Sequence, residues 1–139
     1  MRKVHEHSIK VRFSETDQLG HVNNNNYFVY MEEARIHFFE ALDLVGDGEW
    51  KFVVASVKCD FIQQLYFGQS ITIKSFVTKI GNSSFHLQQN IHEEGSGKLV
   101  AEGNSVVVQF DFATQKSEPM SEWMKQQLAS CQFETTEGR

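Results

Sequence analysis

The chain begins with residues that alternate between apolar and polar. Ile9, Val11 and Phe13 are separated by Lys10 and Arg12, so the three apolar side chains would share one face of a strand over residues 8–13. Residues 14–26 are almost wholly polar and end in four consecutive asparagines. Asparagine suits turns and helix N-caps, so this stretch predicts a loop that leads into a helix.

A long amphipathic helix is expected next. Apolar residues recur at spacings of three and four from residue 27 onward, forming a stripe of Tyr27, Tyr30, Met31, Ala34, Phe38, Ala41, Leu42 and Val45. The stripe spans about four to five turns, and the sequence Gly46-Asp47-Gly48 is expected to end it. Glu32 and Arg35 lie three residues apart and off the stripe, which predicts an ion pair on the helix surface.

After Gly48 the apolar period changes to two, which is typical of strands. Strands are expected over residues 51–62, with residues 53, 55, 57, 59 and 61 on one face, and over 70–80, about 85–92 and 99–110. Glycine-bearing turns at 81–82 and 94–97 join the last three strands. A short helix around residues 121–130 follows the single proline, Pro119.

This order of elements predicts one α+β domain over residues 1–139. One long central helix would pack on the concave face of a curved five-stranded antiparallel sheet. The edge strands of such a sheet stay open, so pairing of two subunits into a continuous sheet is a natural arrangement.

Composition narrows the classes of function. The 139 residues, 40% hydrophobic and 22% charged, fit one folded domain. The 13 basic and 18 acidic residues give a net charge of −5 without a basic cluster, so nucleic acid is not an expected partner. No run reaches the ~20 apolar residues of a membrane span, and the N-terminus lacks an apolar signal stretch, so a cytoplasmic location is expected.

Cysteine and histidine spacing does not indicate a metal site. Cys59 and Cys131 lack the Cys-x-x-Cys spacing of metal and redox sites, and we expect two free thiols. His5-x-His7 could bind a metal, but no third ligand follows at a useful spacing, so no metal is assigned. We expect His86 and His92 on the polar face of their strand, toward solvent or a second subunit.

One segment carries a specific motif. Residues 12–35 read RFSETDQLGHVNNNNYFVYMEEAR and resemble the signature of the hydroxybenzoyl-CoA thioesterase family, which has the hotdog fold. The matching positions are Phe13, Asp17, Gly20, Val22, Asn23, Tyr27, Tyr30, Glu32, Ala34 and Arg35. The Gly-His-Val-Asn-Asn sequence is most similar to the branch of long-chain acyl-CoA thioesterases. Beyond this segment the resemblance rests on strand order and length.

The resemblance implies an acyl-CoA thioesterase with Asp17 as its catalytic carboxylate. Such a carboxylate either attacks the thioester carbonyl or takes a proton from the attacking water. Asn24 matches the position whose backbone N–H polarises the carbonyl, as the free N–H groups at a helix start are able to do. Gly20 would let the loop turn tightly enough to bring Asp17 toward the helix start, and a plain turn glycine is the alternative.

The remaining motif residues imply substrate contacts. His21 and Asn23 match substrate-side positions, although the asparagines could equally be plain capping residues. Tyr27 and Tyr30 are expected in the core or in the wall of the acyl pocket. Glu15 would orient the loop or serve as a second acid.

The resemblance also implies active sites between the subunits of a homodimer or homotetramer, with no metal or organic cofactor. Lysines or arginines must meet the CoA phosphates, and Lys58, Lys74 and Lys79 are candidates. Two alternatives stay open at this stage. One is a non-catalytic acyl-CoA-binding or regulatory module of the same fold, and the other is an acyl-acyl-carrier-protein thioesterase.

Overall fold

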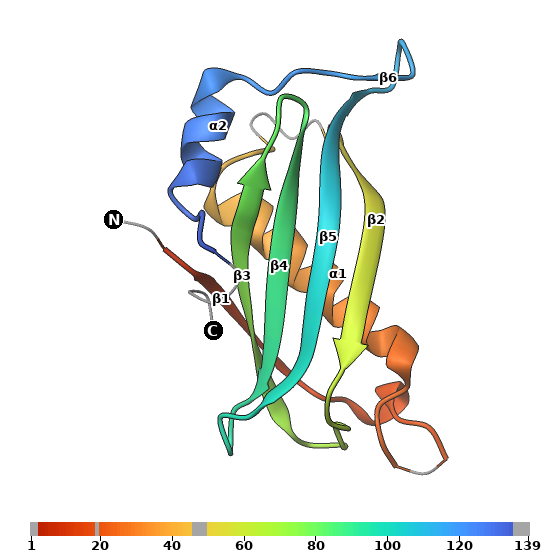
Figure 1. The fold of residues 1–139 in the computed structure, drawn as a ribbon. Helices are drawn as coiled ribbons and strands as arrows, with labels where there is room; N and C mark the ends of the chain where they lie inside the picture. Colours follow the sequence, from red (N-terminus) through yellow and green to blue (C-terminus); the bar gives the residue numbers. More distant parts are fainter. Residues whose placement is uncertain (1–2, 19, 46–49, 135–139) are drawn as a thin grey trace.

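A single long helix lies against one face of a curved antiparallel sheet (Figure 1). The structure, a computed structural model, describes residues 3–18, 20–45 and 50–134. The strand order is β1-β3-β4-β5-β2, and a short β6 pairs with β5. The elements are β1 (His5–Lys10), the 3-10 turn η1 (Phe13–Glu15), α1 (Asn24–Ala41), β2 (Phe52–Phe61), β3 (Ser70–Ile80), β4 (Ser84–Glu93), β5 (Leu99–Asp111), β6 (Lys116–Ser117) and α2 (Glu122–Ala129). The predicted α+β hotdog architecture is confirmed, with β6 as an addition.

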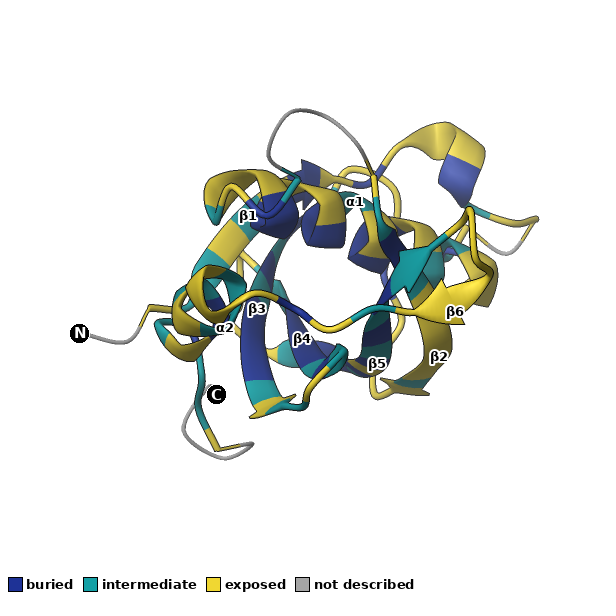
Figure 2. Cartoon of the chain, turned by 90° about the horizontal axis from the view of Figure 1, so that it is seen from above, coloured by how far each residue is buried: buried dark blue, intermediate teal, exposed yellow. Residues whose placement is uncertain are grey.

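The core lies between α1 and the concave face of the sheet, where buried positions of both elements meet (Figure 2). The helix contributes the buried part of its apolar stripe, and alternate residues of β3, β4 and β5 face it. A Cβ built on Gly103 of β5 would collide with the Met31 side chain of α1. The glycine therefore leaves space on the sheet for the Met31 side chain of the helix.

The helix starts earlier than its apolar stripe predicts. Asn23 is the N-cap, and its side chain accepts a 2.9 Å hydrogen bond from the backbone N–H of Asn25. The asparagine run is thus the cap and first turn of α1, because the N-cap hydrogen bond favours helix at that point. The helix ends at Ala41, so the predicted stripe is wrong for Leu42, which is the C-cap, and for Val45 beyond it. The predicted stop at Gly46-Asp47-Gly48 lies outside the described residues.

The predicted first strand over residues 8–13 is displaced toward the N-terminus. β1 pairs with β3 from His5 to Lys10, and the chain then turns into η1. Phe13 is 75% exposed and makes an edge-to-face contact with Phe67 at 5.8 Å instead of joining the core. The apolar–polar alternation continues past Lys10, but β3 begins at Ser70, the residue that pairs with Lys10. Val11 still exchanges backbone hydrogen bonds with Gln69 and Gly68, and within the described residues no strand pairs with the chain at Phe13.

The face predicted for residues 53, 55, 57, 59 and 61 of β2 is not a buried face. Ala55, Val57 and Phe61 are exposed, and the pairing with β5 shifts register between Val54 and Ser56. Of the five residues, Cys59 packs against the core. Since β2 is an edge strand, it has a neighbouring strand on one side only, and its apolar residues lack the cover that central strands receive.

The predicted surface ion pair of Glu32 with Arg35 is also wrong. Arg35 is buried, and its guanidinium donates a long 3.5 Å hydrogen bond to the side-chain oxygen of Gln89 on β4. Burial lowers the pKa of Arg35, and the nearby charge of Glu32 partly opposes that effect. A helix position next to the apolar stripe therefore carries a charge into the core.

Both cysteines are free thiols, as predicted. Cys131 is buried beside α2, and Cys59 is partly buried on β2.

Within the described parts of the chain, neither helix has the length and apolar character needed to cross a membrane.

Candidate active site

The motif segment folds into a small hairpin ahead of α1. Thr16 and Val22 form an antiparallel bridge, and the backbone N–H of Asp17 donates to the carbonyl of His21 at 2.9 Å. The N–H of Gly20 donates back to the carbonyl of Asp17 at 3.0 Å. Gly20 has φ +88°, a backbone conformation that side chains with a Cβ resist. The turn therefore depends on glycine, as the sequence predicts.

The hairpin brings Asp17 and His21 together. The carboxylate of Asp17 lies 3.4 Å from Nδ1 of His21, and the two side chains are 34% and 23% exposed. A carboxylate that is partly exposed and held beside an imidazole is accessible to a substrate. It is also restrained in its orientation.

Glu15 anchors the base of the hairpin. Its buried carboxylate accepts hydrogen bonds from the backbone N–H of Arg12 at 2.8 Å, from the Arg12 guanidinium and from the Tyr30 hydroxyl at 2.8 Å. Burial acts to raise the pKa of Glu15, but the hydrogen bonds from Arg12 and Tyr30 outweigh it and hold the pKa below its ordinary value. The ionised carboxylate is thus a structural part of the loop.

The backbone of Glu15 joins the hairpin to the helix start. Its carbonyl accepts from the backbone N–H of Asn23 and from the side-chain amide of Asn26, both at 3.0 Å. Asn24, the first residue of α1, is exposed, and among the described residues no protein group accepts its backbone N–H. This N–H is aligned with the positive end of the helix dipole and is available to a substrate oxygen.

The two motif tyrosines are buried in the core. Tyr27 and Tyr30 are 2% and 1% exposed, and their rings meet edge to face at 6.3 Å. The Tyr27 hydroxyl donates to the carbonyl of Gln63 at 3.2 Å, and that of Tyr30 to Glu15. Contact of either ring with substrate stays a prediction, while their place in the core is confirmed.

An exposed aromatic rim next to the hairpin was not predicted. The backbones of Tyr66 and His21 form an isolated antiparallel β-bridge, and the Phe67 ring packs on the Phe13 ring. Tyr66 and Phe67 are 48% and 61% exposed. Phe61, 42% exposed, lies against Tyr27. The sequence signal for this rim was the pair of aromatic residues in the segment joining β2 to β3, because exposed aromatic side chains next to each other often mark a binding surface.

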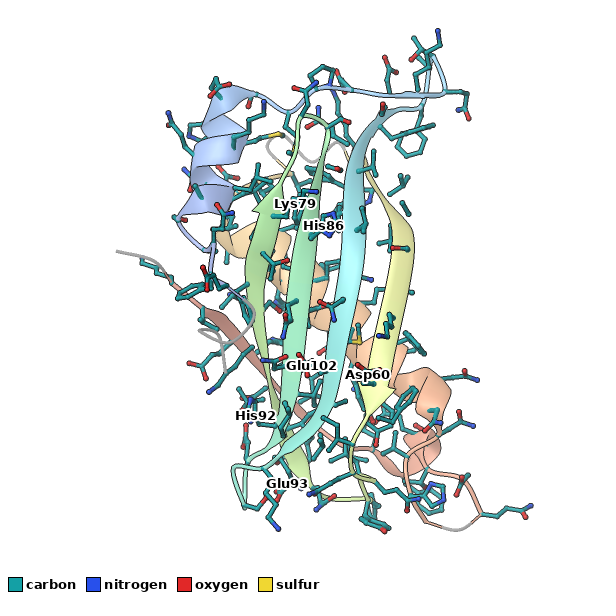
Figure 3. All side chains as sticks on the ribbon, viewed as in Figure 1. Asp60, Lys79, His86, His92, Glu93 and Glu102 are labelled. Carbon is teal, nitrogen blue, oxygen red and sulfur yellow. The ribbon has the colours of Figure 1, made fainter. Side chains whose placement is uncertain are left out.

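The candidate phosphate-binding lysines do not converge. Lys58 lies on the edge strand β2, with its Nζ 3.8 Å from a carboxylate oxygen of Asp60. Lys74 and Lys79 lie on β3, and Lys74 shares a shallow depression with acidic residues. Figure 3 shows Lys79 and His86 toward one end of the sheet, and His92 toward the other. The structure thus assigns no phosphate site to these three lysines as a group.

Comparison with known proteins agrees with the fold and the motif. The profile of the thioesterase-like superfamily matches residues 11–128. The chain is 29% identical to the long-chain acyl-CoA thioesterase FadM of Escherichia coli, over 86% of this chain and 93% of that protein. It superposes on a predicted thioesterase from Bacillus stearothermophilus with a TM-score of 0.87 and 30% identity, covering 95% and 98% of the two chains.

A thioesterase from Thermus thermophilus, solved with coenzyme A and zinc, superposes with a TM-score of 0.79 and 28% identity, covering 92% and 93% of the two chains. The profile match includes the hairpin from Asp17 to His21, the whole of α1 and the central strands. The chain therefore belongs to the thioesterase-like superfamily of hotdog-fold proteins.

Proposed function

We propose that this protein is an acyl-CoA thioesterase, which hydrolyses a CoA thioester to a carboxylic acid and free CoA. The observation that carries the proposal is the hairpin that holds Asp17 beside His21 and is hydrogen-bonded to the start of α1. Family membership and the thioesterase activity named for its relatives support the reaction class.

In this proposal the backbone N–H of Asn24 polarises the thioester carbonyl. A helix N-terminus stabilises the negative charge that develops on that oxygen without using a charged side chain. Asp17 then acts in one of two ways. It attacks the carbonyl carbon, the C–S bond breaks to release CoA as a thiolate, and water hydrolyses the resulting mixed anhydride. Alternatively it removes a proton from a water that attacks the carbonyl, and the C–S bond of the tetrahedral intermediate then breaks to release CoA.

His21 and Asn23 would serve the substrate side. His21 is hydrogen-bonded through its backbone to Asp17 and lies against the aromatic rim at Tyr66, so an acyl-CoA at Asp17 would pass beside it. The exposed rings of Phe61 and Phe67 offer apolar cover for an acyl group. The proposed reaction uses no metal or organic cofactor.

A homodimer or homotetramer is part of the proposal. Five apolar side chains are 42–50% exposed on α1, on β2 and just before β2: Val29, Ile36, Trp50, Val54 and Val57. A groove of about 300 Å³ between α1 and β2 is lined in part by three of them, Ile36, Trp50 and Val54. Apolar surface of this extent next to an open strand edge suits pairing with a second copy. The cytoplasmic location stays a prediction.

The decisive experiment compares kcat for acyl-CoA hydrolysis by the wild type and Asp17→Asn. Asparagine keeps the size and hydrogen-bonding capacity of the side chain, but it is neither a nucleophile nor a base. Loss of a general base lowers kcat by roughly 10²–10⁴-fold, and loss of a nucleophile by more. Asp43→Asn is the matched control, because Asp43 is exposed and lies after the far end of α1.

Thermal unfolding of all three proteins separates chemistry from stability. Matched Tm values with kcat lost only in Asp17→Asn support the assignment. An Asp17→Asn variant that keeps more than about a tenth of wild-type kcat contradicts it. A wild type that binds acyl-CoA without turnover would favour the binding-module alternative, and preference for carrier-protein thioesters of equal chain length would favour the other alternative.

A further inference from the structure

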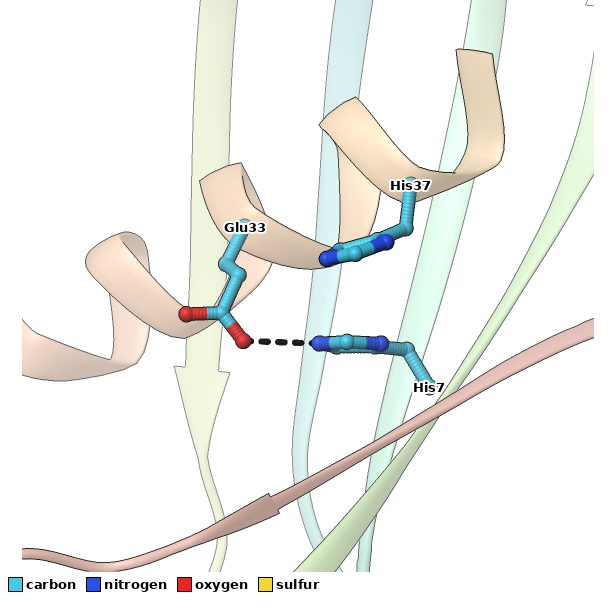
Figure 4. A group of neighbouring side chains, drawn as sticks. All are labelled: His7, Glu33 and His37. Atoms are coloured by element: carbon cyan, nitrogen blue, oxygen red, sulfur yellow. Dashed lines mark hydrogen bonds and ion pairs between the residues drawn. The ribbon is translucent and has the colours of Figure 1, made fainter. Parts of the chain in front are cut away.

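On the β1 side of the molecule, a histidine of the first strand meets a glutamate and a histidine of the central helix (Figure 4). His7 Nε2 lies 2.7 Å from a carboxylate oxygen of Glu33. The rings of His7 and His37 are stacked, with centroids 4.1 Å apart and an interplanar angle of 20°. One ligand atom from each of the three residues lies within 4.8 Å of the other two.

We propose that His7, Glu33 and His37 form a binding site for a divalent transition-metal ion such as Zn²⁺. Such ions bind well to a set of two imidazoles and one carboxylate, whereas Mg²⁺ and Ca²⁺ prefer oxygen ligands. Three protein ligands leave a fourth tetrahedral position for water.

The side-chain periodicities of β1 and α1 together place the three ligands at one position. In β1, alternate residues share a face, so His7 lies on the same side as the core residue Ile9 and faces α1. In α1, Glu33 and His37 are one turn apart, at the i, i+4 spacing that places two side chains side by side. The strand and the helix therefore present three ligands from two elements to one position.

The ligand separations suit a zinc ion after small rotations. Zn–N and Zn–O bonds of about 2.0–2.2 Å at tetrahedral angles place ligand atoms about 3.3 Å apart. The atoms here are 2.7 Å apart for His7 and Glu33 and within 4.8 Å overall, values that bracket this spacing. The stacked rings would have to tilt so that their nitrogens point at one ion. The side chains of Glu33 and His37, 41% and 49% exposed, have room to do so.

A further carboxylate lies beside His37. Its Nδ1 is 3.7 Å from a carboxylate oxygen of Glu40, one turn along the exposed side of the helix, which is beyond hydrogen-bond distance. A small rotation of either side chain would let the carboxylate accept from Nδ1, a contact that in ligating histidines fixes the ring and its tautomer. The other ring nitrogen then remains available on the side of Glu33 (Figure 4).

This site is separate from the proposed active site. Glu33 is nine residues beyond Asn24, which corresponds to about 14 Å along the helix axis. Among the described strands β1 pairs with β3 alone, and a metal at this site would connect it to the central helix as well. Its expected role is to stabilise the N-terminal strand on the fold, because an ion that binds only the folded chain raises its stability.

The test is titration of the untagged, chelator-treated protein with ZnCl₂ by isothermal calorimetry, and with CoCl₂ by visible absorption. The wild type should bind one ion per chain, give Co²⁺ bands typical of tetrahedral N/O ligation and show a higher Tm with zinc that EDTA reverses. Glu33→Gln and His37→Gln should each weaken binding at least tenfold and abolish the rise in Tm. His86→Gln is the matched control, because it removes a histidine from the opposite face of the sheet, and it should bind as the wild type does.

Circular dichroism confirms that each variant is folded before titration. Absence of saturable binding by the wild type below about 100 μM, a concentration that corresponds to weak affinity, would overturn the proposal. Equal affinity of the wild type and both ligand variants would overturn it too. Neither readout involves substrate, so both are independent of the thioesterase assignment.

Discussion

The hydroxyl of Tyr30 donates a 2.8 Å hydrogen bond to the carboxylate of Glu15, and both side chains are buried. This contact joins the second turn of α1 to the base of the Asp17 hairpin, fifteen residues earlier in the chain. The central helix thus supports the base of the Asp17 hairpin through its second turn. Burial and the neighbouring Glu15 carboxylate both raise the pKa of Tyr30, so its hydroxyl stays protonated and remains a donor.

We expect Tyr30→Phe to destabilise the fold and loosen the loop. Removing a hydrogen bond to a buried charged group costs about 1.5–3 kcal/mol of unfolding free energy, and kcat should fall because the Asp17 hairpin loses a support. Urea unfolding and kcat measure the two effects. Tyr66→Phe is the control, since Tyr66 is 48% exposed and its loss of a hydroxyl should change stability by less than about 0.5 kcal/mol. Equal stability of the two variants would contradict a structural role for the Tyr30 contact.

The ionisation of Glu15 should make stability depend on pH. Its pKa is lower in the folded chain than its ordinary 4.5, because the hydrogen bonds from Arg12 and Tyr30 favour the carboxylate despite burial. The stabilisation is fully present above the unfolded pKa and is lost as the pH falls through the folded pKa. Urea unfolding between about pH 7 and pH 3 should therefore show a decline in acid that is reduced in Glu15→Gln. Parallel pH profiles for the two proteins would be inconsistent with this linkage.

Gly20 should be needed for turnover more than for folding. A β-carbon at Gly20 meets nothing within 4 Å, so the strain of Gly20→Val comes from φ +88° alone and costs about 1–2 kcal/mol. The displaced loop would misplace Asp17, and kcat should fall by roughly 10-fold or more. Gly97→Val is a matched control, because Gly97 has φ +72° with equally open space and lies in the β4–β5 turn. If both variants lose stability but neither loses kcat, the loop path does not control the chemistry.

Disruption of the β2 edge should dissociate the proposed dimer. Val57→Asp places a charge on the exposed edge strand, and sedimentation velocity should show a monomer with reduced activity, whereas the wild type sediments as a dimer or larger. Phe112→Asp is the control, since Phe112 at 49% is about as exposed as Val57 at 45% but lies at the β5–β6 turn. A wild type that is a fully active monomer would refute both the interface and a site shared between subunits.

Much of the fold could be predicted from periodicity. The strands at residues 70–80, 84–93 and 99–111 have the predicted extents within a residue or two, because alternate residues of each strand face the helix-covered side of the sheet. The helix stripe from Tyr27 to Phe38 is buried as predicted. The errors fall where neighbours, not local pattern, decide the outcome: Phe13 leaves the sheet where no strand continues beside it, and β2 is apolar but exposed because it is an edge.

The candidate site likewise has features that the local sequence predicts and features that only tertiary packing sets. The sequence by itself determined that Asp17, Gly20 and the asparagine cap lie together, since all belong to one short segment whose turn and helix signals are local. Only the tertiary structure decided that Arg35 is buried against Gln89, that Tyr30 supports Glu15, and that His7 meets Glu33 and His37. A periodic pattern specifies the face on which a side chain lies. The partner on the facing element depends on how strand and helix cross, and packing of the whole chain sets that crossing.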